Sequence, residues 1–445
     1  MISNYIKLAI RVLGRNKFFT AITLFGISFT LAILMLIISV LETEVGETPP
    51  LTDKDKMVIL PSLQLKRQFY DTIYAYDTTM YKSAQIIDTT FTLKENGSNN
   101  SNNEFAHWFL DKHLSKVPNA KNYTFFKSGE IFNSYVNNSK VEMRVTFTDH
   151  RFWEVLDFQF VEGFGFGAQS VEREEPVAVI TTDLADKYYG RTNNIIGEMI
   201  EMDGKNYKIM GLVEPAGVSL LAVDIIVPYT HAAIGSVRSN ESGFGGYMAI
   251  FLGETSADIK LIKEDIKYIN SKTEVPVAAQ GKYDIIKFDA FGYHETYAGQ
   301  ILDLNDEAKS LWIMKLIMMG LIGLFILLPT LNLINLNVSR IMERSSEIGV
   351  RKAFGADQRV ILTQFVIENI VQTFIGGLIG LVMAIVLLNV INEAKLMGDI
   401  ILKLNLRFFI YSFLICLLFG LVSGILPAYK MSKMHVVTAL KQNKL

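Results

Sequence analysis

Cysteine is almost absent from this sequence, since Cys416 is the only one among 445 residues. A single thiol cannot form a disulfide framework within the chain. No charged residue adjoins Cys416, so we expect it to act as a small apolar side chain rather than as a reactive thiol. The motifs G-x-x-x-x-G-K-[ST], H-E-x-x-H, G-x-S-x-G and C-x-x-C are also missing. Their absence excludes nucleotide binding through a P-loop and leaves zinc-protease, hydrolase and dithiol chemistry without support.

Histidine is scarce as well, with six in the chain. Only His107 and His113 lie near each other, and a spacing of six puts them on different faces of a helix. Carboxylates are nearly absent from the apolar runs, where Glu368 stands alone, so no proton relay is indicated. We therefore predict no catalytic, cofactor-binding or metal-ligating residue in this chain.

Long apolar runs are what the sequence does have. A bilayer core of about 30 Å needs roughly 20 helical residues, and buried helices of soluble proteins seldom reach that length without a charge. The first run is too long for a signal-peptide core and no small-x-small cleavage site follows it. We predict an α-helical membrane protein with four transmembrane helices, one in each of the runs Thr20–Leu41, Ile313–Leu336, Ile370–Ile391 and Phe408–Leu426.

Basic residues are distributed unevenly around these runs. They gather before the first run, between the second and third, and after the fourth, which by the positive-inside rule puts both termini and the 339–364 loop in the cytoplasm. Residues 43–310 then lie outside, with 26 basic and 38 acidic residues. An acidic exterior gives no reason to expect a nucleic-acid partner.

The resulting division of the chain has nine segments. It consists of a cytoplasmic amphipathic helix (1–17), transmembrane helix 1 (18–42), an α/β periplasmic core domain (43–292), a stalk with transmembrane helix 2 (293–338), a cytoplasmic coupling loop (339–364), transmembrane helix 3 (365–391), a short periplasmic loop (392–407), transmembrane helix 4 (408–428) and a cytoplasmic tail (429–445).

Residues 2–15 carry a helical pattern with two different faces. Lys7, Arg11 and Arg15 recur at i, i+4, i+8, opposite a row of apolar residues. Such a helix is typical of the membrane surface. The alternative is a cytoplasmic extension of the first span, but the interruption at Gly14–Asn16 favours a separate helix.

The large insert between the first two spans reads as mixed α/β. Its expected strands are Met57–Leu60, Glu142–Phe147, Val177–Ile180, Met199–Glu201, Tyr207–Leu212 and Asp224–Val227, and its expected helices are Glu104–Val117, Thr182–Tyr189 and Ser256–Asn270. Asp203-Gly204 predicts a hairpin turn between two strands. The Asn- and Ser-rich stretch Glu95–Asn103 predicts a flexible surface loop. Residues 293–312 predict a helical stalk that continues into the second span.

The predicted spans contain small residues and one proline. Pro329 predicts a kink, because proline frees a backbone carbonyl inside the helix. Glycines in the third and fourth spans predict close helix contacts, either within the chain or between two copies. These glycines are Gly376, Gly380, Gly420 and Gly424.

The loop after the second span carries the most informative pattern. On a helix, Arg340, Arg344, Glu347 and Arg351 share one charged stripe, and Gly355 ends the helix as a C-cap. The spacing alone fits a solvated helix end as well as a helix that presents charge to a partner.

The same loop resembles the E-I-G-x-R-[KR]-A-x-G-A motif of permeases in the FtsX/MacB superfamily of ABC transporters. The match is gapless from Glu347 to Ala356 and includes Gly349, Arg351, Lys352 and Gly355. The stretch Leu426–Lys441 is similar to the family's P-A-x-x-A-x-x-x-x-P-x-x-A-L-R ending, with Ser432 for the second alanine and Lys441 for the arginine. Blocks between 152 and 213 are similar to the family's periplasmic core domain.

The resemblance implies a dimeric permease, with an identical or homologous second copy, in a bacterial inner membrane. Two copies of a cytoplasmic ABC ATPase would bind ATP and Mg and dock on the segment containing Arg340, Arg344, Glu347, Gly349, Arg351, Lys352 and Gly355. Because the chain starts at the amphipathic helix, we expect that ATPase to be a separate polypeptide and this chain to be no enzyme. ATP hydrolysis would change the periplasmic domain by mechanotransmission.

Three functions are compatible with the resemblance. The first is export of drugs, peptides or toxins, with a periplasmic adaptor and an outer-membrane channel as further partners. The second is release of lipoproteins. The third, of another class, is a non-transporting peptide sensor or a regulator of cell-wall hydrolases.

Overall fold

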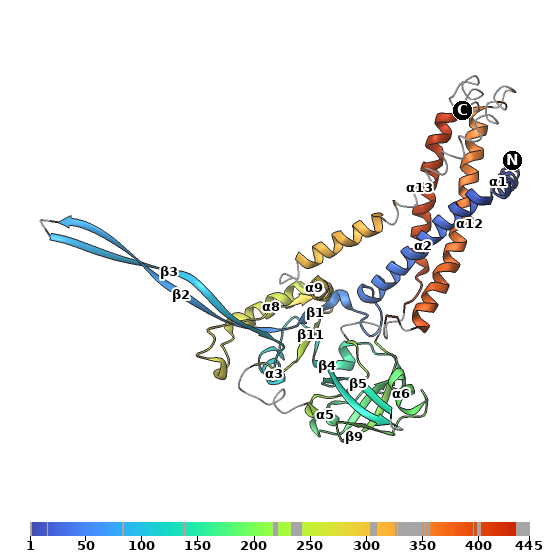
Figure 1. Ribbon diagram of the computed structural model, residues 1–445. Helices are drawn as coiled ribbons and strands as arrows, with labels where there is room; N and C mark the ends of the chain where they lie inside the picture. Colours follow the sequence, from blue (N-terminus) through green and yellow to red (C-terminus); the bar gives the residue numbers. More distant parts are fainter. Residues whose placement is uncertain are drawn as a thin grey trace. The chain divides into compact units, whose positions relative to one another are not determined.

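A computed structural model describes residues 2–15, 17–81, 84–136, 139–216, 221–232, 243–302, 309–324, 327, 350, 354, 357–394, 396–397 and 402–432. Contacts divide the chain into two units. We call Met1–Glu44 with Trp312–Leu445 the helical unit, and Val45–Leu311 the inserted domain. Figure 1 shows the helices of the first and the mixed sheet of the second.

A ten-stranded mixed sheet forms the centre of the inserted domain. Its strand order is β13-β1-β11-β4-β5-β10-β7-β9-β6, with β8 paired to β9. The pairs β5–β10 and β7–β9 are parallel and the remaining pairs are antiparallel. The strands are β1 (Met57–Leu60), β4 (Asn122–Val136), β5 (Ser139–Thr148), β6 (Phe160–Gly163), β7 (Val177–Thr181), β8 (Met199–Met202), β9 (Lys205–Val213), β10 (Ile225–Pro228), β11 (Met248–Leu252) and β13 (Phe291–Gly292).

Both faces of this sheet are covered by apolar side chains. In β1, Val58 and Leu60 belong to one hydrophobic cluster, whereas Met57 and Ile59 belong to the other. Successive side chains of a strand point to opposite faces, so a strand buried on both sides is apolar throughout. This explains why short, uninterrupted apolar runs marked the central strands in the sequence.

Short helices pack on the two clusters. The α- and 3₁₀-helices of the domain are η1 (Lys54–Lys56), α3 (His107–Leu114), α4 (Phe152–Val155), α5 (Ala168–Glu172), α6 (Thr182–Tyr189), η3 (Tyr229–His231), α8 (Asp258–Lys272), η4 (Val277–Ala279) and α9 (Tyr293–Leu302). Helix α6 shows why these elements end where they do. The Thr181 hydroxyl accepts a hydrogen bond from the Leu184 N–H at 3.3 Å, and Gly190 ends the helix with φ +68°.

Several predicted elements are confirmed. Strands β1, β5, β7, β8, β9 and β10 and helices α6 and α8 lie where the pattern placed them, with each end at most three residues away. The turn at Asp203-Gly204 is also confirmed, since both residues have positive φ and Met202 pairs with Lys205. The predicted helix Glu104–Val117 is shorter, because Phe105 forms bridges to Phe244 and Tyr247 and α3 begins only at His107.

The prediction of a loop at Glu95–Asn103 is wrong. This stretch is the second half of β3 (Ala84–Asn103), which pairs along its whole length with β2 (Leu63–Tyr81). A short strand, β12 (Ile285–Lys287), completes this three-stranded sheet beside Gln64–Lys66. Backbone pairing here overrides the low strand propensity of asparagine, serine and glycine. In Figure 1, β2 and β3 form a long twisted ribbon.

The described helices of the helical unit are α1 (Ile2–Arg15), α2 (Lys17–Val45), the helical residues 312–324, α12 (Gln358–Glu393) and α13 (Leu406–Ser432). Two described helices are long and apolar enough to cross a membrane, at Thr20–Thr43 and Val366–Glu393. The fourth predicted span falls in α13, whose described apolar part is Leu406–Leu418. Part of the second span lies outside the described residues, so the count of four stays a prediction.

The predicted stalk is helical in the parts that the structure describes. Helix α9 covers Tyr293–Leu302, and residues 309–324 are helical again.

Candidate functional site

The predicted coupling segment lies almost wholly outside the described residues. This applies to Arg340, Arg344, Glu347, Gly349, Arg351, Lys352 and Gly355, and also to Pro329. Within the segment, Val350 and Phe354 are described, and the Phe354 N–H donates to the Val350 carbonyl at 3.1 Å. That bond has the i to i−4 spacing of one α-helical turn.

Helix α1 separates a charged face from an apolar one. Lys7, Arg11 and Arg15 are exposed, whereas Ala9 and Leu13 are buried. The Thr20 hydroxyl of α2 donates to the Leu13 carbonyl at 2.9 Å and fixes the corner between the two helices. The three cations are therefore free to meet lipid headgroups or solvent on one side of the helix.

Glycines of α12 lie where other helices approach closely. A Cβ atom on Gly376 would come within 2.9 Å of the Ile27 side chain in α2. One on Gly380 would meet the Ser28 carbonyl and the Leu31 Cβ at 3.1 Å. Gly377, between these two, faces α13 instead, because a Cβ atom there would overlap the Phe413 ring.

These contacts belong to a small-residue seam within one chain. Gly420 and Gly424 lie within α13.

Helix α12 contains four buried polar residues close to one another. They are Glu368, Asn369, Gln372 and Thr373, of which the sequence analysis named only Glu368. They form two i, i+4 pairs, so they occupy one side of the helix over two turns. A polar pair at this spacing inside an apolar run is the signal that would have revealed them. Buried polar side chains within a membrane bundle favour helix association and mark functional positions.

The ends of three helices are tied together by a short loop. The Asn392 side chain donates to the Leu402 carbonyl at 2.9 Å and accepts from its N–H at 3.0 Å. Ser39 of α2 donates to the Lys403 carbonyl at 2.8 Å. Asn405 donates to the Glu42 carboxylate of the same helix. Helices α2, α12 and α13 are thereby linked at this end by side-chain hydrogen bonds as well as by packing.

In the inserted domain, the two chain ends lie beside each other. Strand β1 pairs with β13 through Val58–Gly292 and Ile59–Phe291. The buried Lys54 ammonium lies 5.1 Å from the centre of the Tyr293 ring, a cation–π contact. The entering segment and the leaving helix α9 are therefore joined by backbone pairing and by this contact.

A carboxylate connects this junction to α8. Glu295 accepts a hydrogen bond from the Gly292 N–H at 2.8 Å and forms an ion pair with Lys263 of α8. Both side chains of the pair are about three-quarters buried. The contacts of Lys54, Tyr293, Lys263 and Glu295, with the β1–β13 ladder, form what we call the junction cluster.

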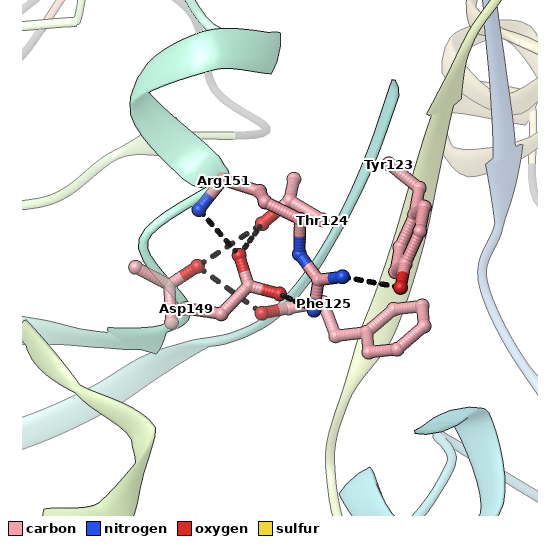
Figure 2. Close-up of polar contacts among 6 residues, drawn as sticks. Tyr123, Thr124, Phe125, Asp149 and Arg151 are labelled. Carbon is pink, nitrogen blue, oxygen red and sulfur yellow. Dashed lines mark hydrogen bonds and ion pairs between the residues drawn. The ribbon is translucent and has the colours of Figure 1, made fainter. Parts of the chain in front are cut away.

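A second buried polar group lies deeper in the domain (Figure 2). Asp149, which follows β5, accepts hydrogen bonds from the Thr124 hydroxyl at 2.9 Å and from the Arg151 N–H at 3.0 Å. The Arg151 guanidinium pairs with the same carboxylate at 3.1 Å and lies 4.1 Å from the centre of the Tyr123 ring. Burial raises the pKa of Asp149, against the opposing effects of Arg151 and Thr124.

His107 adjoins this group inside an aromatic enclosure. Its ring stacks on Tyr229 with centroids 3.7 Å apart and makes edge contacts with Phe125 and Tyr247. Its Nε2 atom is buried with no hydrogen-bond partner among the residues that the structure describes. Burial, helped by the nearby Arg151 charge, lowers the pKa of His107 from 6.5 to about 4. The ring is therefore neutral at physiological pH.

The described side chains that could take part in chemistry have structural partners or are buried. Across the described parts of both units, no three His, Cys, Asp or Glu side chains are placed to hold a metal ion. The buried carboxylate Asp149 is engaged by an arginine and a threonine, and the Cys416 thiol is buried.

Comparison with known families identifies the class of this fold. The family model of the MacB-like periplasmic core domain matches residues 20–268, and that of the FtsX-like permease C-terminal region matches residues 319–436. The first match covers more than half of the chain. The chain belongs to the MacB-like periplasmic core domain family and is an FtsX/MacB-like permease. The first description names a periplasmic domain and the second a permease region.

Individual relatives are more distant. The chain is 26% identical to the pyoverdine export ATP-binding/permease protein PvdT of Pseudomonas entomophila (strain L48), over 68% of this chain and 43% of the relative. It is 27% identical to the macrolide export ATP-binding/permease protein MacB of Bdellovibrio bacteriovorus, over 62% of this chain and 40% of the relative. The chain thus spans about two fifths of the length of the curated relatives it matches.

A solved structure, the periplasmic region of MacB from Actinobacillus actinomycetemcomitans, is 14% identical to the chain. The match covers 46% of this chain and 85% of that one, with a TM-score of 0.33. A score of this size reflects only distant similarity.

Proposed function

We propose that this chain is the permease component of a MacB-like ABC transporter that exports drugs, peptides or toxins. The observation that carries the proposal is the order of the two matched regions. The MacB-like periplasmic core domain match begins within the first apolar helix, and the FtsX-like permease region begins at residue 319 and includes α12 and α13. The names of two relatives, which specify macrolide export and pyoverdine export, support an export role for this chain too.

In this proposal, movement rather than substrate passes through the helices. An ABC ATPase binds ATP and Mg, docks on the charged segment from Arg340 to Gly355, and displaces the second span. The glycine contacts of α12 with α2 and α13 support joint movement, because helices in backbone-to-side-chain contact cannot slide without steric conflict. The junction cluster then passes the displacement into the sheet and into α8.

The same proposal places the protein in a bacterial inner membrane with both termini in the cytoplasm. Lys7, Arg11 and Arg15 of α1 lie against anionic lipid headgroups, where each surface cation contributes about 1 kcal/mol. A second permease copy or a homologue completes the dimer. A periplasmic adaptor and an outer-membrane channel complete the export route.

The decisive test is a charge reversal in the docking segment. We expect Glu347→Lys to abolish stimulation of the ATPase by the permease without loss of membrane insertion, because it replaces the one acidic residue between Arg344 and Arg351. Glu393→Lys, the same substitution at the last residue of α12, is the matched control and should preserve stimulation. Full stimulation by the Glu347 variant would refute the docking assignment.

A further inference from the structure

The ribbon formed by β2 and β3 is much longer than its support. Strand β12 pairs only with Gln64–Lys66, so from Arg67 to Tyr81 β2 has β3 as its single neighbour among the described strands. Fifteen residues of strand extend for roughly 50 Å. Two-stranded ribbons are marginally stable in water without a packing surface. The ribbon therefore lacks a cover within the described part of the inserted domain.

Part of one face of this ribbon is apolar and uncharged. The register pairs Thr72 with Leu93 and Tyr74 with Phe91, so these four residues share a face, which we call the aromatic face. Tyr74, Phe91 and Leu93 are 57%, 64% and 60% exposed. At the end of this face nearer the sheet, Gln68 links the Tyr70 hydroxyl to the Glu95 carboxylate by hydrogen bonds of 2.6 and 3.2 Å.

The opposite face has a different character. It presents Asp71 directly opposite Lys94, next to Ile73 and Thr92. Charged side chains at these opposite positions favour a hydrated face. The aromatic face is consequently the side of the ribbon that gains from being covered.

Charge distinguishes the ribbon from the rest of its domain. Residues 63–103 hold four basic and four acidic residues, whereas the rest of the inserted domain holds 22 basic and 33 acidic residues. Two acidic domains repel each other electrostatically. This repulsion is weakest between their ribbons, which have no net charge. The balance of charge thus permits self-association through the ribbon.

The size of the face indicates which kind of partner it can hold. Large side chains present about 150–250 Å² each, so three that are about 60% exposed offer about 300 Å². A stable interface between soluble proteins buries about 800 Å² on each partner. The face is therefore too small to capture a soluble protein from solution. The face is large enough for a partner that the membrane already holds nearby. The high effective concentration of such a partner makes a small buried area sufficient for association.

We propose that the aromatic face packs against the aromatic face of a second copy of this chain, with the two membrane-anchored copies related by a two-fold axis. Such an interface is self-complementary, so each residue of the face lies close to the same face of the partner copy. This inference rests on the proposed dimeric permease and adds where the dimer makes contact outside its helices.

Single cysteines can test this arrangement in the full chain. Cys416→Ser removes the native thiol, after which Tyr74→Cys and Leu93→Cys label the aromatic face. Ile73→Cys and Thr92→Cys, one residue away on the opposite face, are the matched controls. In lipid nanodiscs, a short bismaleimide should link the first two variants into dimers about tenfold more efficiently than the controls. Added salt should change this yield little, because the face is uncharged.

Three results would overturn the inference, and they separate its failure from that of the proposed function. If native mass spectrometry shows dimers but both faces crosslink equally or not at all, the ribbon contact is wrong and the permease dimer stands. If the chain is monomeric in nanodiscs, both are wrong. If crosslinking in native membranes joins Tyr74→Cys to a protein of another mass, the face serves a different partner and the self-contact is wrong.

Discussion

Acidification is expected to destabilise the inserted domain through His107. Its folded-state pKa of about 4 lies below the value of 6.5 for a free histidine. Between these values the unfolded chain binds a proton that the folded domain excludes, so stability falls as the pH is lowered through this window. The stabilisation is fully present above pH 6.5. It is lost progressively down to about pH 4.

The magnitude follows from the size of the shift. The fall in the pKa from 6.5 to about 4, at 1.36 kcal/mol per pKa unit, limits the effect to about 3 kcal/mol. About 2 kcal/mol of this is lost between pH 7 and pH 5. Asp149 acts in the opposite direction, because burial raises the pKa of its carboxyl group and protonation then favours the folded state. The pH profile of the wild type alone therefore does not isolate His107.

His107→Phe keeps the stacking surface toward Tyr229 and removes the titrating group. Hydrogen exchange of α3 in the full chain, followed at pH 7 and pH 5, measures the local opening free energy. We expect the wild type to lose about 2 kcal/mol more protection than the variant over this interval. His113→Phe, on the same helix, should retain most of the wild-type loss. Equal pH dependence in the wild type and in His107→Phe would refute the reasoning.

Two further predictions concern glycines in close contact. Gly163→Ala places a Cβ atom 2.1 Å from the Met210 carbonyl at φ +72°, and should lower the free energy of unfolding by about 3 kcal/mol. Gly190→Ala, at φ +68° with no atom within 4 Å of the added Cβ, is the control and should lower the free energy of unfolding by only about 1 kcal/mol. Chemical denaturation measures both values, and equal losses would contradict the predicted steric clash at Gly163. Gly380→Leu should separate α12 from α2 and reduce stability in detergent by about 1–3 kcal/mol. Gly320→Leu, in open space, should leave stability nearly unchanged, and equal effects would contradict the seam.

The strands that could be predicted from sequence are those whose burial leaves a simple pattern. Strand β7 is buried at every position, so its apolar run, Val177–Ile180, ends within one residue of the strand end at Thr181. Asp203-Gly204 is a turn because only a few residue types accept positive φ at both positions. In both cases the local sequence alone determines the backbone conformation.

The long ribbon could not be predicted because its cause is not local. The segment after Glu95 is rich in asparagine and serine, which by composition favours a loop. Pairing with Leu63–Phe69 forces the extended conformation instead. Strand β4 was missed for a related reason, since a bulge between Lys127 and Glu130 interrupts the alternation of its side chains.

The buried polar groups of the inserted domain could not be predicted from the local sequence either. Asp149 and Arg151 are two residues apart and read as ordinary surface charges, but Thr124 and Tyr123 from β4 enclose them. Only a contact between distant segments makes this carboxylate a buried group. By contrast, the charged stripe of α1 follows from helical spacing within 15 residues, and its exposure could be anticipated.

The relative strength of the contacts in the junction cluster decides which of them can carry the proposed movement. The Lys263–Glu295 pair is partly exposed, and ion pairs of this kind contribute about 1 kcal/mol or less. The β1–β13 ladder has only two residue pairs. Tyr293 is 1% exposed, and full burial of a large side chain contributes about 1.5–3 kcal/mol. A pull on α9 therefore acts on the sheet mainly through the Tyr293 ring, and the ion pair serves chiefly to orient α8 toward that helix.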